Sequence, residues 1–167
     1  MDENDGLLRE SEQRFRGAMR AASIGMCLVG PDGSFLEVNP ALCALLGRDE
    51  ADLTVTTWQE LTHPDDLEID VSLVQEVLDG ERESYQLLKR YLRPDGEIVW
   101  GDLSVSCVRT PDGDVQYFVS QINDVTRRIT AEQELAKAEE KFRLVAENAA
   151  SFVLLIGADD EITWVSP

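Results

Sequence analysis

The alternation of apolar and polar residues is clearest between residues 84 and 126. Three segments there are rich in β-branched and aromatic residues, and two Pro-Asp-Gly triplets separate them: 84–93, 97–109 and 115–125, with the triplets at 94–96 and 111–113. Proline presets φ, aspartate tolerates the next turn position and glycine accepts a positive φ, so each triplet predicts a hairpin turn. The pattern therefore predicts three consecutive antiparallel strands.

Both faces of these strands carry large apolar side chains. In the middle strand, Val99 and Leu103 belong to a mainly apolar face. The opposite face still carries Trp100, Tyr117 and Val119. Because a solvated face rarely keeps three such residues together, we expect an amphipathic element to cover it.

The first candidate for that element is a helix over residues 8–22. The series with four-three spacing there is apolar except for Glu12 and includes Phe15 and Met19. We assign residues 1–22 to an N-terminal amphipathic helix. It is expected to cover the face of Trp100 and Tyr117, or to pair with a second copy of the chain.

The segment between this helix and residue 84 predicts a hairpin followed by short helices. Residues 23–29 and 35–39 flank a third Pro-Asp-Gly triplet. Short helical segments are expected over 40–46 and 49–62, and a longer helix over 64–78. His63 stands where this helix needs an N-cap, so we expect it to cap rather than to act in catalysis or bind a metal.

The chain after residue 126 predicts a second helix and the start of a repeat. Residues 127–149 carry a short heptad seam that includes Leu135 and Phe142, which favours a parallel dimer. Residues 8–40 align without gaps on residues 135–167 at an offset of 127. A period this long predicts a tandem array of domains. A second, truncated domain is therefore expected from residue 150.

Composition narrows the possible partners. There are 15 basic and 33 acidic residues, and the net charge of −18 argues against binding nucleic acid or an anionic membrane. Three widely spaced cysteines fit a reducing compartment. No apolar run approaches ~18 residues and the start is acidic, so neither a membrane helix nor a signal peptide is expected. We expect a cytoplasmic location.

Four motifs together resemble a PAS domain with its C-terminal PAC portion: His63-Pro64-Asp65-Asp66, the segment 85–96, Ile98-Val99-Trp100, and Asp124-Val125-Thr126-Arg127-Arg128. The resemblance covers about residues 9–130. It implies an α+β fold, with a five-stranded antiparallel sheet, short helices on one face, an N-terminal helix and a C-terminal signalling helix. The expected boundaries are 1–22, 23–126, 127–149 and 150–167.

In such a fold, a pocket would lie between the helices and the inner face of the sheet. The expected lining is Cys27, Val29, Trp58, Leu61, Val71, Val74, Tyr85, Leu87, Tyr91, Leu103, Val105, Phe118, Ser120 and Ile122. The pocket is predicted to be mostly apolar, with the tyrosine hydroxyls and Ser120 as orienting groups. The alternative is that these side chains only fill a packed core.

The resemblance also allows the residues that bind cofactors in related proteins to be looked for in this sequence. Flavin-binding LOV relatives carry a reactive cysteine motif that is absent here, and the positions aligned with their flavin-reading amides are Tyr91, Gly101 and Ile122. Haem-binding relatives use a histidine on the long helix, and residues 64–78 contain none. Both observations argue against these cofactors. Another flavin type or a small apolar ligand stays possible, and no metal is expected.

The function implied is that of a sensory module in a multi-domain signalling protein. The output would be a histidine kinase, a diguanylate cyclase or a phosphodiesterase outside this chain, since no nucleotide-binding or nucleophile motif appears in it. Asp124 and Thr126 are the expected relay into the exit helix, where they can cap its start. A homodimer through the two long helices is expected, and the alternative function is a ligand-free dimerisation scaffold.

Overall fold

The computed structural model describes residues 3–147, 154–156 and 162–165. The chain forms two compact units, Met1–Thr126 and Arg127–Pro167.

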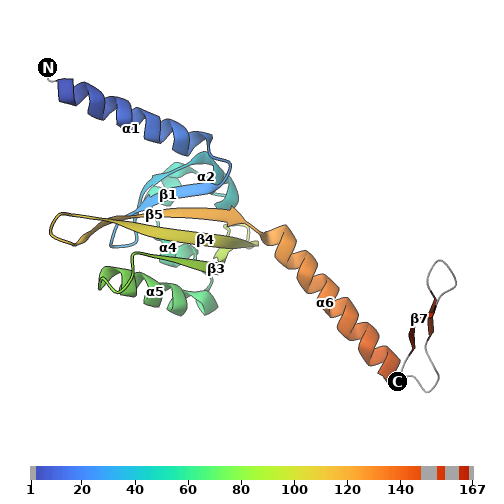
Figure 1. Cartoon of the computed structure of the whole chain (residues 1–167). Coiled ribbons are helices and arrows are strands. Elements are labelled where there is room, and N and C mark those ends of the chain that lie inside the picture. The colour runs from blue at the N-terminus through green and yellow to red at the C-terminus, as the bar shows by residue number, and fades with distance from the viewer. Residues whose placement is uncertain (1–2, 148–153, 157–161, 166–167) are drawn as a thin grey trace. The chain divides into compact units, whose positions relative to one another are not determined.

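The first unit is built around one antiparallel sheet (Figure 1). Its strands are β1 (Gly25–Val29), β2 (Phe35–Val38), β3 (Ser84–Leu92), β4 (Ile98–Arg109) and β5 (Val115–Asp124). They lie in the order β2-β1-β5-β4-β3, so that the first and last strands of the unit are neighbours in the middle of the sheet. Their register runs from Gly25 opposite Ile122 to Val29 opposite Phe118. The predicted five-stranded antiparallel sheet is confirmed.

The three Pro-Asp-Gly triplets form the hairpin turns that the sequence predicts. Their glycines, Gly33, Gly96 and Gly113, have φ values of 89°, 85° and 97°. A side chain with a Cβ atom rarely adopts this left-handed backbone, whereas glycine adopts it without steric cost. The turns therefore fix where β2, β4 and β5 begin.

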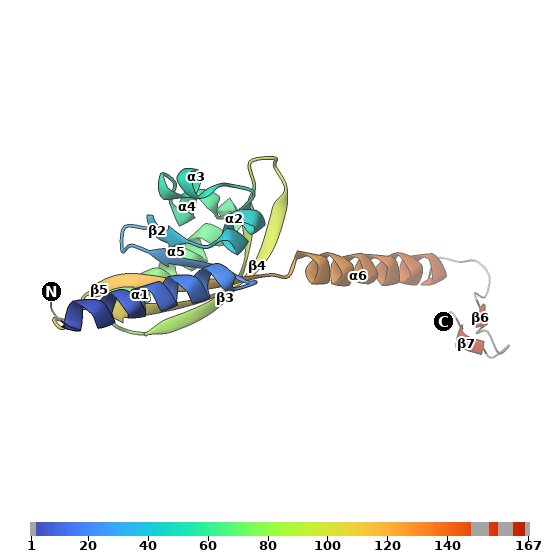
Figure 2. The same cartoon turned by 90° about the horizontal axis from the view of Figure 1, so that it is seen from above.

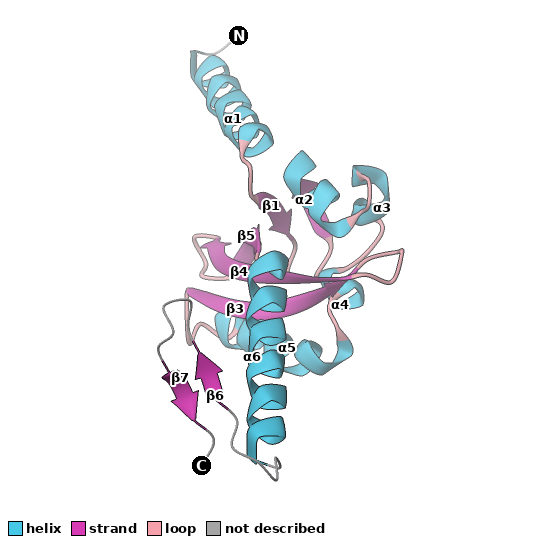
Figure 3. Ribbon diagram, turned by 90° about the vertical axis from the view of Figure 1, so that its right-hand side faces the viewer, coloured by secondary structure: helices cyan, strands magenta, loops and turns pink. Residues whose placement is uncertain are grey.

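A layer of four helices lies on one face of the sheet (Figure 2). These are α2 (Pro40–Leu46), α3 (Glu50–Thr54), α4 (Trp58–Leu61) and α5 (Pro64–Leu78). The hydrophobic core lies between this layer and the sheet. Figure 3, in which strands are magenta, shows α5 beside β3.

The start of α5 is held as the sequence predicts. The Nδ1 atom of His63 accepts a hydrogen bond from the backbone N–H of Asp65 at 3.2 Å, and His63 occupies the N-cap position. The backbone N–H of His63 also donates to the carbonyl of Arg90 at 2.9 Å. The cap therefore also attaches the start of α5 to β3.

The first helix, α1 (Glu3–Ala21), ends beside β2 and does not cover Trp100. Met19 is buried, and its carbonyl accepts a hydrogen bond from the Asn39 side chain; Arg16 pairs with Glu37 at 3.5 Å. Phe15 is 44% exposed. The prediction that this helix covers the face of Trp100 and Tyr117 within one chain is therefore wrong. Its apolar spacing fixed the face of the helix but not the surface that receives it.

The helix α6 (Thr126–Glu147) begins at the last residue of the first unit and continues through the second. Leu135 is 62% exposed and Phe142 is 37% exposed on it. The second unit also contains the hairpin of β6 (Leu154–Ile156) and β7 (Ile162–Val165), as the repeat predicts. The remaining residues of the predicted second domain lie outside those described. Among the helices that the structure describes, none is long and apolar enough to cross a membrane.

Candidate ligand site

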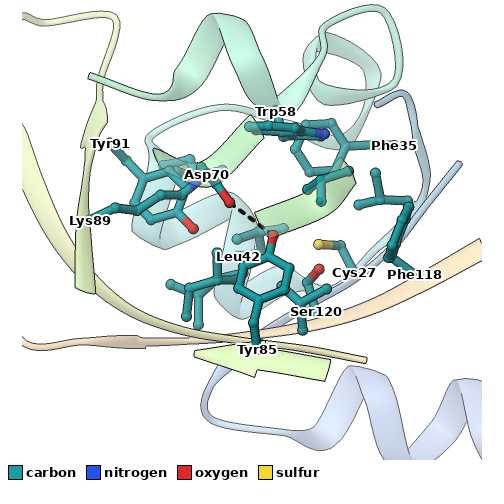
Figure 4. A pocket seen from close by; sticks show the side chains of 16 residues that line it. Cys27, Phe35, Leu42, Trp58, Asp70, Tyr85, Lys89, Tyr91, Phe118 and Ser120 are labelled. Atoms are coloured by element: carbon teal, nitrogen blue, oxygen red, sulfur yellow. Dashed lines mark hydrogen bonds and ion pairs between the residues drawn. The ribbon is translucent and has the colours of Figure 1, made fainter. Parts of the chain in front are cut away.

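A cavity lies between the helical layer and the inner face of the sheet (Figure 4). About 40 Å³ of it is open to the centres of water molecules, which corresponds to about three water molecules. The lining side chains come from both layers: Cys27, Val29, Phe35, Leu42, Leu46, Trp58, Asp70, Val74, Tyr85, Lys89, Tyr91, Leu103, Val105, Phe118, Ser120 and Ile122.

The structure brings most of the predicted lining residues together at this cavity. Those that line it are Cys27, Val29, Trp58, Val74, Tyr85, Tyr91, Leu103, Val105, Phe118, Ser120 and Ile122. Leu61 is fully buried in the core but does not line the cavity, and Leu87 packs against the core from its edge. The binding of a ligand by these residues stays a prediction.

The sequence placed Val71 on the wrong side of α5. Its side chain is 45% exposed and lies outside the cavity. The inward positions of the helix include Asp70, Val74 and Val77, at four-three spacing. A search for apolar residues alone passes over Asp70 and takes its neighbour, because an aspartate is normally assigned to the solvent face.

The two charged lining residues were missed altogether. Lys89 is 2% exposed and Asp70 is 1% exposed. A signal for Lys89 did exist, because it shares the inward face of β3 with Tyr85, Leu87 and Tyr91, at two-residue spacing. The sequence analysis also missed three buried apolar residues of the lining, Phe35, Leu42 and Leu46. They come from β2 and α2, and only the folded arrangement brings them to the cavity.

The charged residues form a hydrogen-bonded network that joins the helices to β3. The Lys89 ammonium donates to Asp70 Oδ2 at 2.5 Å and to the hydroxyl of Thr62 at 2.9 Å. The Tyr85 hydroxyl donates to Asp70 Oδ1 at 2.8 Å, the contact drawn as a dashed line in Figure 4. The Thr62 hydroxyl donates in turn to the carbonyl of Trp58 at 2.8 Å. The cavity is therefore polar at this end, and the prediction of a mostly apolar lining needs correction there.

Aromatic rings surround the lysine head. The Nζ atom of Lys89 lies 5.0 Å from the ring centroid of Trp58 and 4.6 Å from that of Tyr91, within the range of cation–π attraction. Burial lowers the pKa of Lys89, and the neighbouring Asp70 carboxylate opposes this by favouring the charged form. The ammonium thus exchanges its water shell for a carboxylate, a hydroxyl and two ring faces.

The other titratable lining groups are kept neutral. Burial raises the pKa of Cys27 to about 12, although its hydrogen bond with Ser120 partly opposes the shift. Burial also raises the pKa values of Tyr85 and Tyr91, and the Asp70 carboxylate adds to both shifts. A thiol with a raised pKa is a poor nucleophile at neutral pH. Cys27 therefore forms part of the cavity wall and is not a reactive thiol.

Gly101 determines how closely the sheet approaches Tyr91. A Cβ atom at this buried position would lie 2.5 Å from Cε2 of Tyr91 and 2.8 Å from Cγ2 of Ile122. Both neighbours line the cavity. The absence of a side chain at Gly101 therefore leaves room for the Tyr91 ring beside the ammonium of Lys89.

We expect Gly101→Ala to destabilise the protein by about 1–3 kcal/mol, because the new methyl group must displace the Tyr91 ring. Urea unfolding of this variant checks the expectation. Gly17→Ala on α1 is the control, since no atom outside the adjacent residues and the helix's own backbone lies within 4 Å of its Cβ position. Equal stability of the two variants would show that Tyr91 moves without cost.

Arg90, the residue after Lys89, lies on the opposite face of β3 and makes a second set of contacts. The Arg90 guanidinium donates to Asp66 at 3.0 and 2.6 Å, and its centre lies 5.4 Å from the ring centroid of Trp100. The hydrogen bonds from Arg90 lower the pKa of Asp66. Arg90 therefore connects α5 to the outer face of β4.

The backbone of Trp100 is hydrogen-bonded to the residues at the start of α6. Its backbone N–H donates to the hydroxyl of Thr126, and its carbonyl accepts from the backbone N–H of Val125, both at 2.9 Å. Asp124 Oδ1 accepts the backbone N–H of Thr126 at 2.9 Å. The geometry thus gives Asp124 a role at the helix start, as the sequence suggested, and attaches Thr126 to β4.

Comparison with known proteins gives relatives among signalling proteins. The chain is 41% identical over 140 residues to the probable diguanylate cyclase DgcE of Escherichia coli (strain K12), covering 84% of this chain and 13% of that protein. It is 23% identical over 149 residues to the sensor histidine kinase TmoS of Ectopseudomonas mendocina, covering 89% and 15%. The chain thus spans only a small part of these relatives.

A solved structure and a family model agree with the fold. The structure of a sensory box histidine kinase/response regulator from Burkholderia thailandensis E264 superposes with a TM-score of 0.62 at 24% identity, covering 78% of this chain and 98% of that one. The family model described as PAS fold matches residues 35–122, more than half of the chain. With this match and the observed sheet and helical layer, the chain belongs to the PAS family, and its module resembles those of diguanylate cyclases and sensor histidine kinases.

Proposed function

We propose that residues 23–126 form an input module that binds a small molecule in the cavity and relays the change through the start of α6. The output would be an enzymatic domain such as a diguanylate cyclase or a histidine kinase, carried by the same longer protein. The observation that carries this proposal is a continuous set of contacts from the cavity wall to Thr126.

The contacts begin where α5 meets β3. Asp70 and Asp66 lie one helical turn apart on α5, and they bind the neighbouring residues Lys89 and Arg90 of β3. Lys89 points into the cavity, whereas Arg90 lies on the other face of the sheet. A ligand that moves either partner of the inner pair therefore changes the position of the outer pair.

The contacts continue across the outer face. Arg90 stacks on the indole of Trp100, and the backbone of Trp100 holds Val125 and Thr126. A shift of β3 against β4 would alter the two hydrogen bonds that fix the helix start. Because a helix cap contributes about 1 kcal/mol, such a change is large enough to bias a linker with two states several-fold.

A second candidate function is a dimerisation scaffold. It is favoured by the exposed apolar side chains of Leu135 and Phe142 on α6, which have the spacing of a coiled-coil seam. The two functions are compatible, since a dimer of the α1 and α6 helices could carry the relay. A scaffold alone would leave the output insensitive to changes in the cavity.

We expect Asp124→Ala to uncouple the module from its output without unfolding it. The test is a chimera in which this chain replaces the matching segment of the E. coli relative, with diguanylate cyclase activity as the measurement. Loss of a cap contributing about 1 kcal/mol predicts a change of roughly five-fold in activity. Asp112→Ala, in the exposed β4–β5 turn, is the control. Equal activities of the two chimeras would contradict the relay.

A further inference from the structure

The buried ion pair between Lys89 and Asp70 is part of the cavity wall. Both side chains line the open space, and both are almost completely removed from solvent. Apolar residues of similar size usually give a fold at least as much stability as a buried ion pair does. Titratable groups that are buried at a cavity are instead frequent in functional sites.

Each member of the pair has a second partner that holds it in place. Lys89 also donates to Thr62, and Asp70 also accepts from Tyr85. If a ligand opened the direct contact between ammonium and carboxylate, each group would keep one hydrogen bond. Each would also lose its counter-charge, and the few water molecules for which the cavity has room would not solvate an ion as bulk water does.

This requirement selects the charge of the ligand. A neutral apolar molecule between the two groups would leave two separated buried charges, and a molecule with one charge would leave the other group uncompensated. A zwitterion compensates both, with its carboxylate on Lys89 and its ammonium on Asp70. The rings of Trp58 and Tyr91 lie within cation–π range of Lys89 and so favour the charged form of this lysine, which would bind the carboxylate.

We propose that the cavity binds a small zwitterion of the α-amino acid class, which inserts between Lys89 and Asp70. The proposal rests on the proposed function, in which this cavity is the ligand site. Its volume, equal to about three water molecules, fits a compact ligand of this kind and limits the length of its side chain. Binding would replace the direct contact between α5 and β3 with one through the ligand.

The test is a titration of the 167-residue chain with single α-amino acids, followed by calorimetry and by the thermal unfolding midpoint. For each amino acid that binds, two analogues are measured: the amide, which lacks the carboxylate, and the parent carboxylic acid, which lacks the amine. We expect each analogue to bind at least about 100-fold more weakly, since it leaves one buried charge without a partner. An analogue that binds as tightly as the amino acid would overturn the proposal.

Two further variants test whether the amino acid binds in the cavity. The double variant Asp70→Leu/Lys89→Met removes both charges at similar volume and should abolish amino-acid binding. Val71→Phe, on the exposed side of the same helix, should leave it unchanged. Unchanged binding by the double variant would overturn the proposal. If uncharged molecules bind in the cavity and amino acids do not, the zwitterion is wrong and the input function stands; if no molecule binds, both are wrong.

Discussion

Asp70→Leu is expected to lower the free energy of unfolding by about 3–5 kcal/mol, because it leaves the Lys89 ammonium buried without its counter-charge. The Tyr85 hydroxyl loses its acceptor in the same variant. The lysine can relieve part of the cost by releasing its proton. The unfolded state then binds more protons than the folded state, so stability should rise with pH toward the usual lysine pKa of about 10.4.

A double-mutant cycle in urea separates the ion pair from the loss of volume. Asp70→Leu and Lys89→Met are measured singly and together. Since removal of both charges leaves no uncompensated ion, the double variant should be more stable than the sum of the single effects predicts, by about 2–3 kcal/mol. Additive effects would mean that the two groups do not interact as the structure shows.

Asn39→Ala is expected to cost about 3 kcal/mol or more, because this buried amide uses both of its polar atoms. Its Oδ1 atom accepts from the backbone N–H groups of Met26 and Leu42, and its Nδ2 atom donates to the carbonyls of Met19 and Ile24, all at 2.9 Å. A buried backbone group left without a partner costs about 1–3 kcal/mol. Alanine would leave several in this state at once.

Asn39 matters for the site because it joins the end of α1, the start of β1 and the start of α2. The last of these elements supplies Leu42 and Leu46 to the cavity. Urea unfolding measures the loss, with Asn123→Ala on the exposed surface of β5 as the control, expected within about 0.5 kcal/mol of the wild type. A loss below 1 kcal/mol for Asn39→Ala would show that water replaces the missing partners.

The strands and turns could be predicted from sequence because their determinants are local. Each Pro-Asp-Gly triplet specifies a turn within a few residues, and alternation along β4 and β5 separates the two faces of the sheet. The cap at His63 is local in the same sense. Apolar lining residues such as Leu103 and Phe118 followed from this alternation.

The polar end of the cavity was missed, because a search for apolar positions passes over charged residues even where they share the inward face. Asp70 and Lys89 are 19 residues apart, and each is buried against the opposite charge of the other. Hydrophobic patterning assigns such residues to solvent, which moved the predicted lining from Asp70 to Val71. The prediction of where α1 packs was wrong for a related reason. Its end is held by the side-chain amide of Asn39, a polar contact that apolar patterning does not detect.

The most direct test of the relay is hydrogen exchange at the start of α6 in a variant that fills the cavity. Val74→Phe adds volume on the lining side of α5, and Val71→Phe adds the same group on the exposed side. If the cavity is coupled to Thr126, Val74→Phe should change amide exchange at residues 126–130 several-fold, and Val71→Phe should leave it as in the wild type. Identical exchange in the two variants would contradict the account.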